Sequence, residues 1–122
     1  MKLAIIGSRG FSDYGHLSFV MTEWFGRYAN DNPYSLVTEV ISGGANGADK
    51  LAARWAKENG IKLTEFIPDW NGLGKRAGFV RNQDIVKAAD VVLAFWDGES
   101  KGTGNSLSIA KRLKKPTIVI YF

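Results

Sequence analysis

The sequence contains no cysteine and a single histidine, and these two absences exclude several kinds of chemistry. Without cysteine, the 122-residue chain forms no disulfide framework, no thiolate metal site and no cysteine nucleophile. One histidine, His16, is too few for a multi-histidine zinc site, and we expect neither a metal nor a cofactor. Proline is also scarce, at 3 residues, whereas glycine is abundant at 14. Part of the chain therefore requires a permissive backbone.

Long hydrophobic runs are absent as well. No apolar run approaches the roughly 18 residues of a membrane span, and the stretch from Leu3 to Ile6 is too short for a signal peptide. We therefore expect a cytoplasmic protein with no membrane partner. A chain of 122 residues is long enough for one domain with a core and too short for two. The net charge of +4 favours anionic partners, without separating nucleic acid from a small phosphate ligand.

Five apolar runs alternate with segments of helical periodicity. The runs predict strands at 2–6, 37–41, 63–67, 91–96 and 116–121, and the periodic segments predict helices at 17–28, 48–56, 79–89 and 105–113. Residues 71–78 have no period and are predicted to form a functional loop. Strands that are apolar throughout must be covered on both faces. The fold class is therefore α/β: one domain over 1–122, with a Rossmann-like open parallel sheet of about five strands and helices on both faces.

Glycine-rich loops follow the first, second and fourth predicted strands. All three begin at carboxyl ends of strands, where ligands of such sheets bind, so we expect them to converge on one crevice. The loop from Ser42 to Gly47 leads into a helix, and its backbone N–H groups could hold a phosphate or could simply form a tight turn. It is not an ATP-binding P-loop, because Gly47 is followed by Ala48 and Asp49. A dinucleotide motif at 102–107 is incomplete, so an NAD site is not expected either.

The loops together carry a specific set of short motifs. They are Gly7-Ser8-Arg9, Ser42 to Asp49, Pro68-Asp69-Trp70, Gly74 with Ala77-Gly78 and Arg81-Asn82, Ala89-Asp90, and Phe95 to Gly98 with Gly102-Thr103. In this order they closely resemble the cpYpsA-related branch of the SLOG superfamily, over essentially the whole chain. The resemblance implies a Rossmann-like domain that binds nucleotides, nucleotide-derived ligands or related phosphosugars, often as a homo-oligomer.

Several side chains in these motifs suit an anionic ligand. Arg9 could grip a phosphate or form a surface ion pair, and Arg81 could be a second anion clamp. Asp49 could orient its loop or accept from ribose hydroxyls, or could only stabilise the helix start. Trp70 could stack a base or belong to the edge of the core. The predicted ligand-binding residues are Gly7, Ser8, Arg9, Ser42, Gly43, Gly44, Ala45, Gly47, Asp49, Asp69, Trp70, Arg81, Asn82, Asp97, Gly98, Ser100, Gly102 and Thr103.

Three functions are compatible with these residues. The first is a sensor or sequestering protein that binds a nucleotide or nucleotide-derived phosphate ligand. The second is a hydrolase acting on an N-glycosidic or phosphate bond of a nucleotide, with Asp49, Asp97 or Glu99 as acid/base. It is placed second because Ser106 stands where the similar Lonely Guy phosphoribohydrolases carry a glutamate. The third is a DNA-associated protein, since some SLOG relatives bind single-stranded DNA. Nucleic acid ranks low among the expected partners, because no interleaved aromatic and basic residues stand out.

Overall fold

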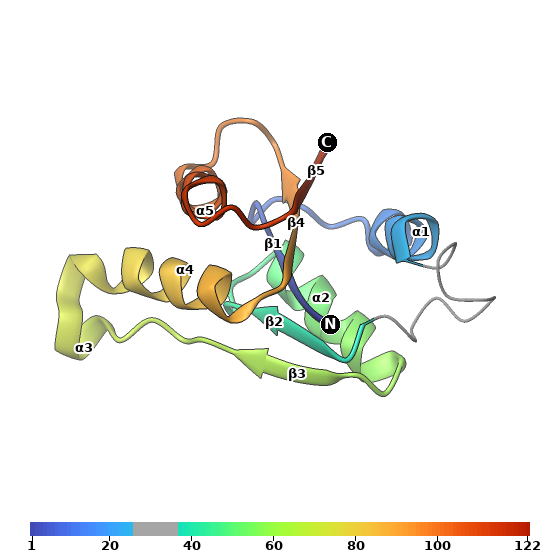
Figure 1. Ribbon diagram of the computed structural model, residues 1–122, viewed down its shortest axis with the longest axis horizontal. Coiled ribbons are helices and arrows are strands. Elements are labelled where there is room, and N and C mark those ends of the chain that lie inside the picture. Colours follow the sequence, from blue (N-terminus) through green and yellow to red (C-terminus); the bar gives the residue numbers. More distant parts are fainter. Residues whose placement is uncertain (26–36) are drawn as a thin grey trace.

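The computed structural model describes residues 1–25 and 37–122, and its centre is a five-stranded parallel sheet (Figure 1). The strands are β1 (Lys2–Gly7), β2 (Glu39–Ser42), β3 (Lys62–Glu65), β4 (Val91–Trp96) and β5 (Thr117–Tyr121), and they lie in the order β3-β2-β1-β4-β5. The helices are α1 (Tyr14–Phe25), α2 (Ala48–Glu58), α3 (Trp70–Leu73), η2 (Gly74–Arg76), α4 (Ala77–Ala88) and α5 (Lys101–Arg112). The predicted α/β class and parallel sheet are confirmed.

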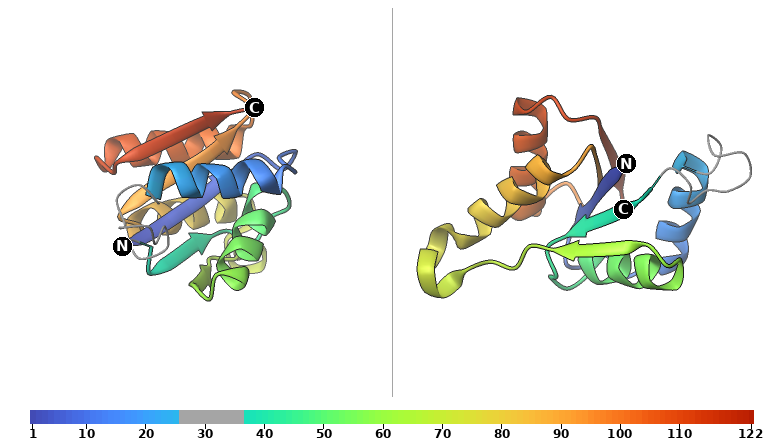
Figure 2. Two further views of the ribbon diagram at one scale, coloured as in Figure 1. Left: turned by 90° about the vertical axis from the view of Figure 1, so that its right-hand side faces the viewer. Right: turned by 60° about the horizontal axis from the view of Figure 1, so that its bottom comes forward.

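The two faces of the sheet have separate cores. Side chains alternate along a strand, so Leu3 and Ile5 of β1 point to one face and Ala4 and Ile6 to the other. Helices α1 and α2 cover the Leu3 face, and the indole of Trp55 is buried there. Helices α4 and α5 cover the opposite face (Figure 2). Helices therefore flank both sides of the sheet, as the continuous apolar strands predicted.

The largest differences from the predictions are at residues 71–78 and at the start of α5. The segment 71–78 is not an irregular loop but forms α3, η2 and the start of α4, and Asp69 caps α3 by accepting from the Gly72 N–H at 2.9 Å. Helix α5 begins at Lys101 rather than about residue 105, with two glycines in its first turns. One of them, Gly104, packs closely on Trp96, since a Cβ there would lie 3.4 Å from the indole. The predicted end of the first helix near Tyr28 falls outside the described residues.

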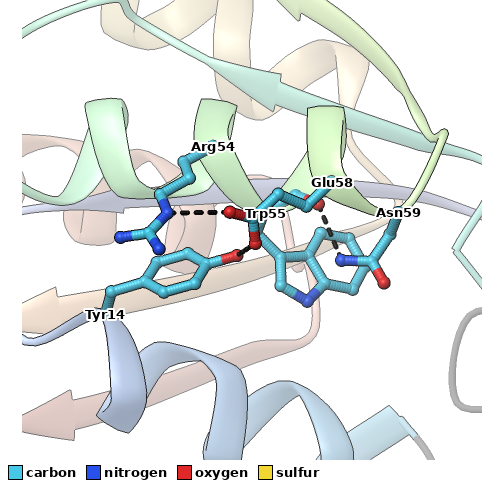
Figure 3. A network of polar contacts seen from close by, with 5 residues as sticks. All are labelled: Tyr14, Arg54, Trp55, Glu58 and Asn59. Carbon is cyan, nitrogen blue, oxygen red and sulfur yellow. Dashed lines mark hydrogen bonds and ion pairs between the residues drawn. The ribbon is translucent and has the colours of Figure 1, made fainter.

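A polar network holds the start of α1 against α2 (Figure 3). The Tyr14 hydroxyl donates to Glu58 Oε2 at 2.6 Å, and Arg54 Nε donates to Glu58 Oε1 at 2.9 Å. The Arg54 guanidinium lies 3.8 Å from the centre of the Tyr14 ring. Burial, together with the hydrogen bond to Glu58, raises the pKa of Tyr14. Because α1 follows directly on the loop after β1, this network anchors the far side of that loop.

Among residues 1–25 and 37–122, no helix is both long enough and apolar enough to cross a lipid bilayer.

Candidate functional site

The winding of the chain reverses between β1 and β4. Strands β2 and β3 lie on one side of this point and β5 lies on the other. Ligands of open α/β sheets bind at the carboxyl ends of the strands at such a point. A pocket of about 360 Å³ lies there in this protein. It is lined by Ile6, Gly7, Ser8, Arg9, Gly10, Ala45, Asp49, Arg81, Asn82, Ile85, Ser100, Lys101, Gly102, Thr103 and Ser106.

The loop after β1 forms one wall of the pocket because Gly7 has no side chain. A Cβ on Gly7 would overlap the carbonyl oxygen of Phe95 and lie 2.8 Å from the Ala48 Cβ. The absence of that atom lets β1 end close against β4 and α2. The next residue, Ser8, donates its N–H to the Phe95 carbonyl at 2.8 Å, and its buried hydroxyl accepts from the Asp97 N–H at 3.2 Å. The first and fourth loops are thereby joined.

Asp97 shapes the fourth loop through its own carboxylate. Its Oδ1 accepts from the N–H groups of Glu99 and Ser100, both at 2.8 Å, and from the Ser100 hydroxyl at 2.9 Å. The backbone N–H groups of Ser100 and Glu99 lower the pKa of Asp97 to about 2. The Ser100 hydroxyl is also hydrogen-bonded to the Ser8 hydroxyl at 2.9 Å, and here Ser8 is the donor because the single Ser100 proton points to Asp97. Asp97 therefore holds the backbone that precedes α5 and does not line the pocket.

Helix α5 points its N-terminus into the pocket. Its first intrahelical bond runs from the Gly104 N–H to the Ser100 carbonyl at 3.1 Å. Within the described residues, the N–H groups of Lys101, Gly102 and Thr103 have no acceptor, and all three residues line the pocket. Free N–H groups and the positive end of a 12-residue helix favour an anion at this place.

Arg81 of α4 brings a positive charge to another part of the pocket wall. Its Nη1 donates to the Gly43 carbonyl at 2.9 Å and its Nε to Asn82 Oδ1 at 3.1 Å. Three of the five N–H bonds of the guanidinium remain free for a ligand, as far as the described part of the chain shows. Gly43 makes this position possible, because a Cβ there would overlap Nη1 and lie 3.0 Å from Cζ. Burial lowers the pKa of Arg81, yet a guanidinium stays charged at any physiological pH.

Asp49 is the acidic group that lines the pocket, and it is almost completely buried, with 7% of its surface exposed. Its Oδ2 accepts from the Ala45 N–H at 3.1 Å. Burial raises the pKa of Asp49, although the Ala45 N–H and the charge of Arg81 oppose this shift. Arg9 and Lys101 are exposed at the rim, and neither has a hydrogen-bond or ion-pair partner in the described ranges. Three cations thus face one carboxylate.

The structure brings ten of the predicted ligand-binding residues together. Those that line the pocket are Gly7, Ser8, Arg9, Ala45, Asp49, Arg81, Asn82, Ser100, Gly102 and Thr103. Those outside its lining are Ser42, Gly43, Gly44, Gly47, Asp69, Trp70, Asp97 and Gly98, as is the catalytic candidate Glu99. The structure adds Ile6, Gly10, Ile85, Lys101 and Ser106. Ile85 could have been identified from the sequence, because it follows the predicted site residue Asn82 by three positions and therefore lies on the same face of α4.

Two of the glycines outside the lining still shape the pocket. Gly47 has a φ of 79°, and a Cβ there would overlap the carbonyl oxygens of Ser8 and Arg9. The second loop can therefore pass directly beside the first only because this residue is glycine. Gly43 acts in a different way, by leaving room for the Arg81 guanidinium.

The acid/base candidates of the sequence analysis have different surroundings. Asp49 lines the pocket, Asp97 is engaged by the loop amides, and Glu99 is exposed outside the pocket. Ser106, at the position of the phosphoribohydrolase glutamate, is buried in the pocket wall, and its hydroxyl donates to the Gly102 carbonyl at 3.3 Å. In the described ranges, no three histidine, aspartate or glutamate side chains gather as a metal site would need.

Comparison with known proteins places the chain in a family. Residues 1–72 match the family described as YspA, cpYpsA-related SLOG. The Gene 61 protein of Mycobacterium phage D29 is 37% identical over 123 residues, which cover 96% of this chain and 94% of the phage protein. The chain belongs to the YspA, cpYpsA-related SLOG family. The predicted SLOG branch is therefore confirmed.

A solved structure shares the fold of this SLOG protein. DNA processing protein A from Helicobacter pylori, which binds single-stranded DNA, superposes with a TM-score of 0.67 at 24% sequence identity. The match covers 98% of this chain and 64% of that protein, so the chain spans about two thirds of its length. This likeness shows that the Rossmann-like architecture is common to both proteins.

Proposed function

We propose that this SLOG protein binds single-stranded DNA, with the sugar–phosphate backbone held in the pocket at the switch point. The observation that carries the proposal is the pocket itself, where Arg9, Arg81 and Lys101 line the same cavity as the free N–H groups at the start of α5. Phosphate oxygens accept from guanidinium groups and from helix N-termini, and these contacts need no particular base.

The dimensions of the pocket suit one unit of a polymer. Its volume of about 360 Å³ is near the lower end of the range for small-ligand sites, so we infer that it holds one nucleotide unit at a time. Arg9 and Lys101 stand at the solvent-facing rim, where they can contact phosphates of neighbouring nucleotides. Ile6 and Ile85 offer an apolar floor against which a sugar can pack.

The sequence alone favours a nucleotide or nucleotide-derived small molecule as the ligand and ranks nucleic acid low among the expected partners. That preference is wrong, because the protein found to share the fold over 98% of this chain binds single-stranded DNA. The DNA-associated alternative agrees with this finding. The error arose because backbone N–H groups and arginines recognise phosphate whether it belongs to a free nucleotide or to a polymer.

Fluorescence anisotropy with a labelled oligothymidylate tests the proposal. Log affinity should fall linearly with log salt concentration, and Arg9→Ala should weaken binding and reduce the slope by about 0.7, the value for one phosphate contact on a single strand. Arg9→Lys should retain most of the slope, because it keeps the charge. Lys111→Ala is the matched control: it removes an exposed cation from the last turn of α5, about 15 Å along the helix from Lys101.

Two results would contradict the proposal. One is an Arg9→Ala variant with unchanged affinity and salt slope. The other is displacement of the oligothymidylate by an equal concentration of thymidine monophosphate, which would indicate a site that recognises single nucleotides.

A further inference from the structure

An arm formed by residues 66–81, which include α3, η2 and the start of α4, extends away from the sheet (Figures 1 and 2). Several of its large apolar side chains are exposed to solvent. Trp70 is 58% exposed and Phe79 is 61% exposed, and Ile67 and Val80 are exposed beside them. The pocket described above does not use these side chains. Several large exposed apolar residues within one short segment of the chain indicate a binding surface rather than scattered surface positions.

Basic side chains lie between the two aromatic residues in the chain. Lys75 and Arg76 form most of η2, are exposed, and have no hydrogen-bond or ion-pair partner within the part of the chain that the structure describes. Over residues 66–81 the arm has three cations and one carboxylate, Asp69. Aromatic rings interleaved with cations are the surface that single-stranded nucleic acids require, because bases stack on the rings and phosphates pair with the cations.

The arm is continuous with the phosphate pocket through Arg81. This residue lines the pocket, and it also borders a shallow depression of about 90 Å³ shared with Ile67 and Val80 of the arm. Gly78 precedes Arg81 by three residues and shares its face of α4, whereas Phe79 precedes Arg81 by two residues and lies on the opposite face. The other ring, Trp70, is seated on α4 by Gly78, where an added Cβ would lie 3.6 Å from the indole. A strand leaving the pocket past Arg81 therefore meets the arm next.

We propose that Trp70 and Phe79 stack bases of the DNA that flank the nucleotide held in the pocket. This inference rests on the proposed function and extends it, because it makes the site several nucleotides long. Charge favours DNA as the occupant over a two-fold contact of the arm with itself: that contact would bring Lys75 and Arg76 against the same cations of a second copy, whereas DNA brings phosphates to them. The expectation that the chain lacks interleaved aromatic and basic residues is thereby corrected, since α3 and η2 gather them on one arm.

The test compares Trp70→Ala and Phe79→Ala with the matched control Phe19→Ala, which removes an equally exposed ring from α1. Each arm variant should bind a long oligothymidylate about 5- to 150-fold more weakly, the range for one stacked base. The salt slope should stay at the wild-type value, because no phosphate contact is lost. The wild type should lose a similar factor in affinity when an oligonucleotide of the same length carries abasic sites. Trp70→Phe keeps an aromatic ring and should recover the affinity that Trp70→Ala loses.

The outcomes separate this inference from the proposed function. If Arg9→Ala weakens binding but neither arm variant does, the pocket binds DNA and the arm inference is wrong. If the wild type binds no oligothymidylate, the proposed function fails and the arm inference with it. Sedimentation equilibrium provides the remaining outcome: a dimeric wild type that becomes monomeric in Trp70→Ala, with unchanged DNA affinity, would make the arm a self-association surface and overturn the proposal.

Discussion

Gly43→Ala separates the position of the Arg81 guanidinium from its charge. The new methyl group would overlap Arg81 Nη1 and lie 3.0 Å from both Arg81 Cζ and Asp49 Oδ2. Gly43 does not have a positive φ, so the backbone accepts alanine without strain. The atoms in the way are ends of side chains, and the flexible arginine will move before the backbone does. We therefore expect the fold to be retained and the bond from Nη1 to the Gly43 carbonyl to be lost.

The size of the effect follows from what Arg81 contributes. Hydrogen bonds to charged groups are worth about 1.5–3 kcal/mol, so Arg81→Ala should weaken binding of oligothymidylate about 10- to 150-fold. Gly43→Ala should lose a large part of the binding free energy that Arg81→Ala loses. In the Arg81→Ala background, Gly43→Ala should then have little further effect, because the group that it displaces is already absent.

The assay is anisotropy at one fixed salt concentration for wild type, both single variants and the double variant, with urea denaturation to verify folding. Gly15→Ala on α1 is the control, since it adds the same methyl group where the nearest atom is Asp13 Oδ1 at 3.5 Å. Equal losses from Gly43→Ala with and without Arg81 would refute the reasoning, because the methyl group would then act on the ligand directly.

Two further predictions concern the carboxylates. Asp49→Asn should tighten DNA binding in the same titration, because it removes the negative charge that lines the pocket. Burial raises the pKa of Asp49 above its ordinary value of 3.8. Its contribution to the stability of the fold is therefore greatest below pH 3.8 and is lost as the pH rises through the pKa of the folded state. Urea denaturation at a series of pH values should show Asp49→Asn becoming more stable relative to wild type as the pH increases. Asp97 has the opposite sign: its pKa of about 2 means that it stabilises the fold above pH 3.8 and loses this effect as pH falls towards 2. Asp97→Asn should lower the melting temperature at neutral pH, and a deficit that persists unchanged at pH 2 would contradict the role of the carboxylate in the loop.

The three central strands, β2, β1 and β4, were predictable because most of their side chains are buried on both faces of the sheet. Val91 to Trp96 is apolar at every position and coincides with β4. Helix α5 was predicted too short because Gly102 and Gly104 resemble a loop in the sequence, whereas both lie in the helix and Gly104 packs against Trp96. Helix α3 was missed because its four residues are too few to show a period.

Site residues could be predicted where their position follows from a single loop, and less well where it depends on contact between segments that are distant in the sequence. Arg9 follows a strand end, so its place at the pocket could be read from the chain. The fit between Gly43 and Arg81 could not, since 38 positions separate them in the sequence. Lys101 was missed because the predicted helix began at residue 105, so the start of α5 at Lys101 was not recognised. Trp70 was expected in the crevice but lies on the arm, because α3 directs the chain away from the sheet.

Amide chemical shifts measured by NMR on adding unlabelled oligothymidylate test the central claim most directly. If DNA binds in the pocket, the largest shifts should occur at the free N–H groups of Gly102 and Thr103 and in the loop from Ser8 to Gly10, and the Arg81 guanidinium resonance should shift as well. The amides of 111–115, at the other end of α5, should stay in place. Shifts confined to 111–115, with the pocket amides unmoved by saturating oligonucleotide, would contradict DNA binding at the switch point.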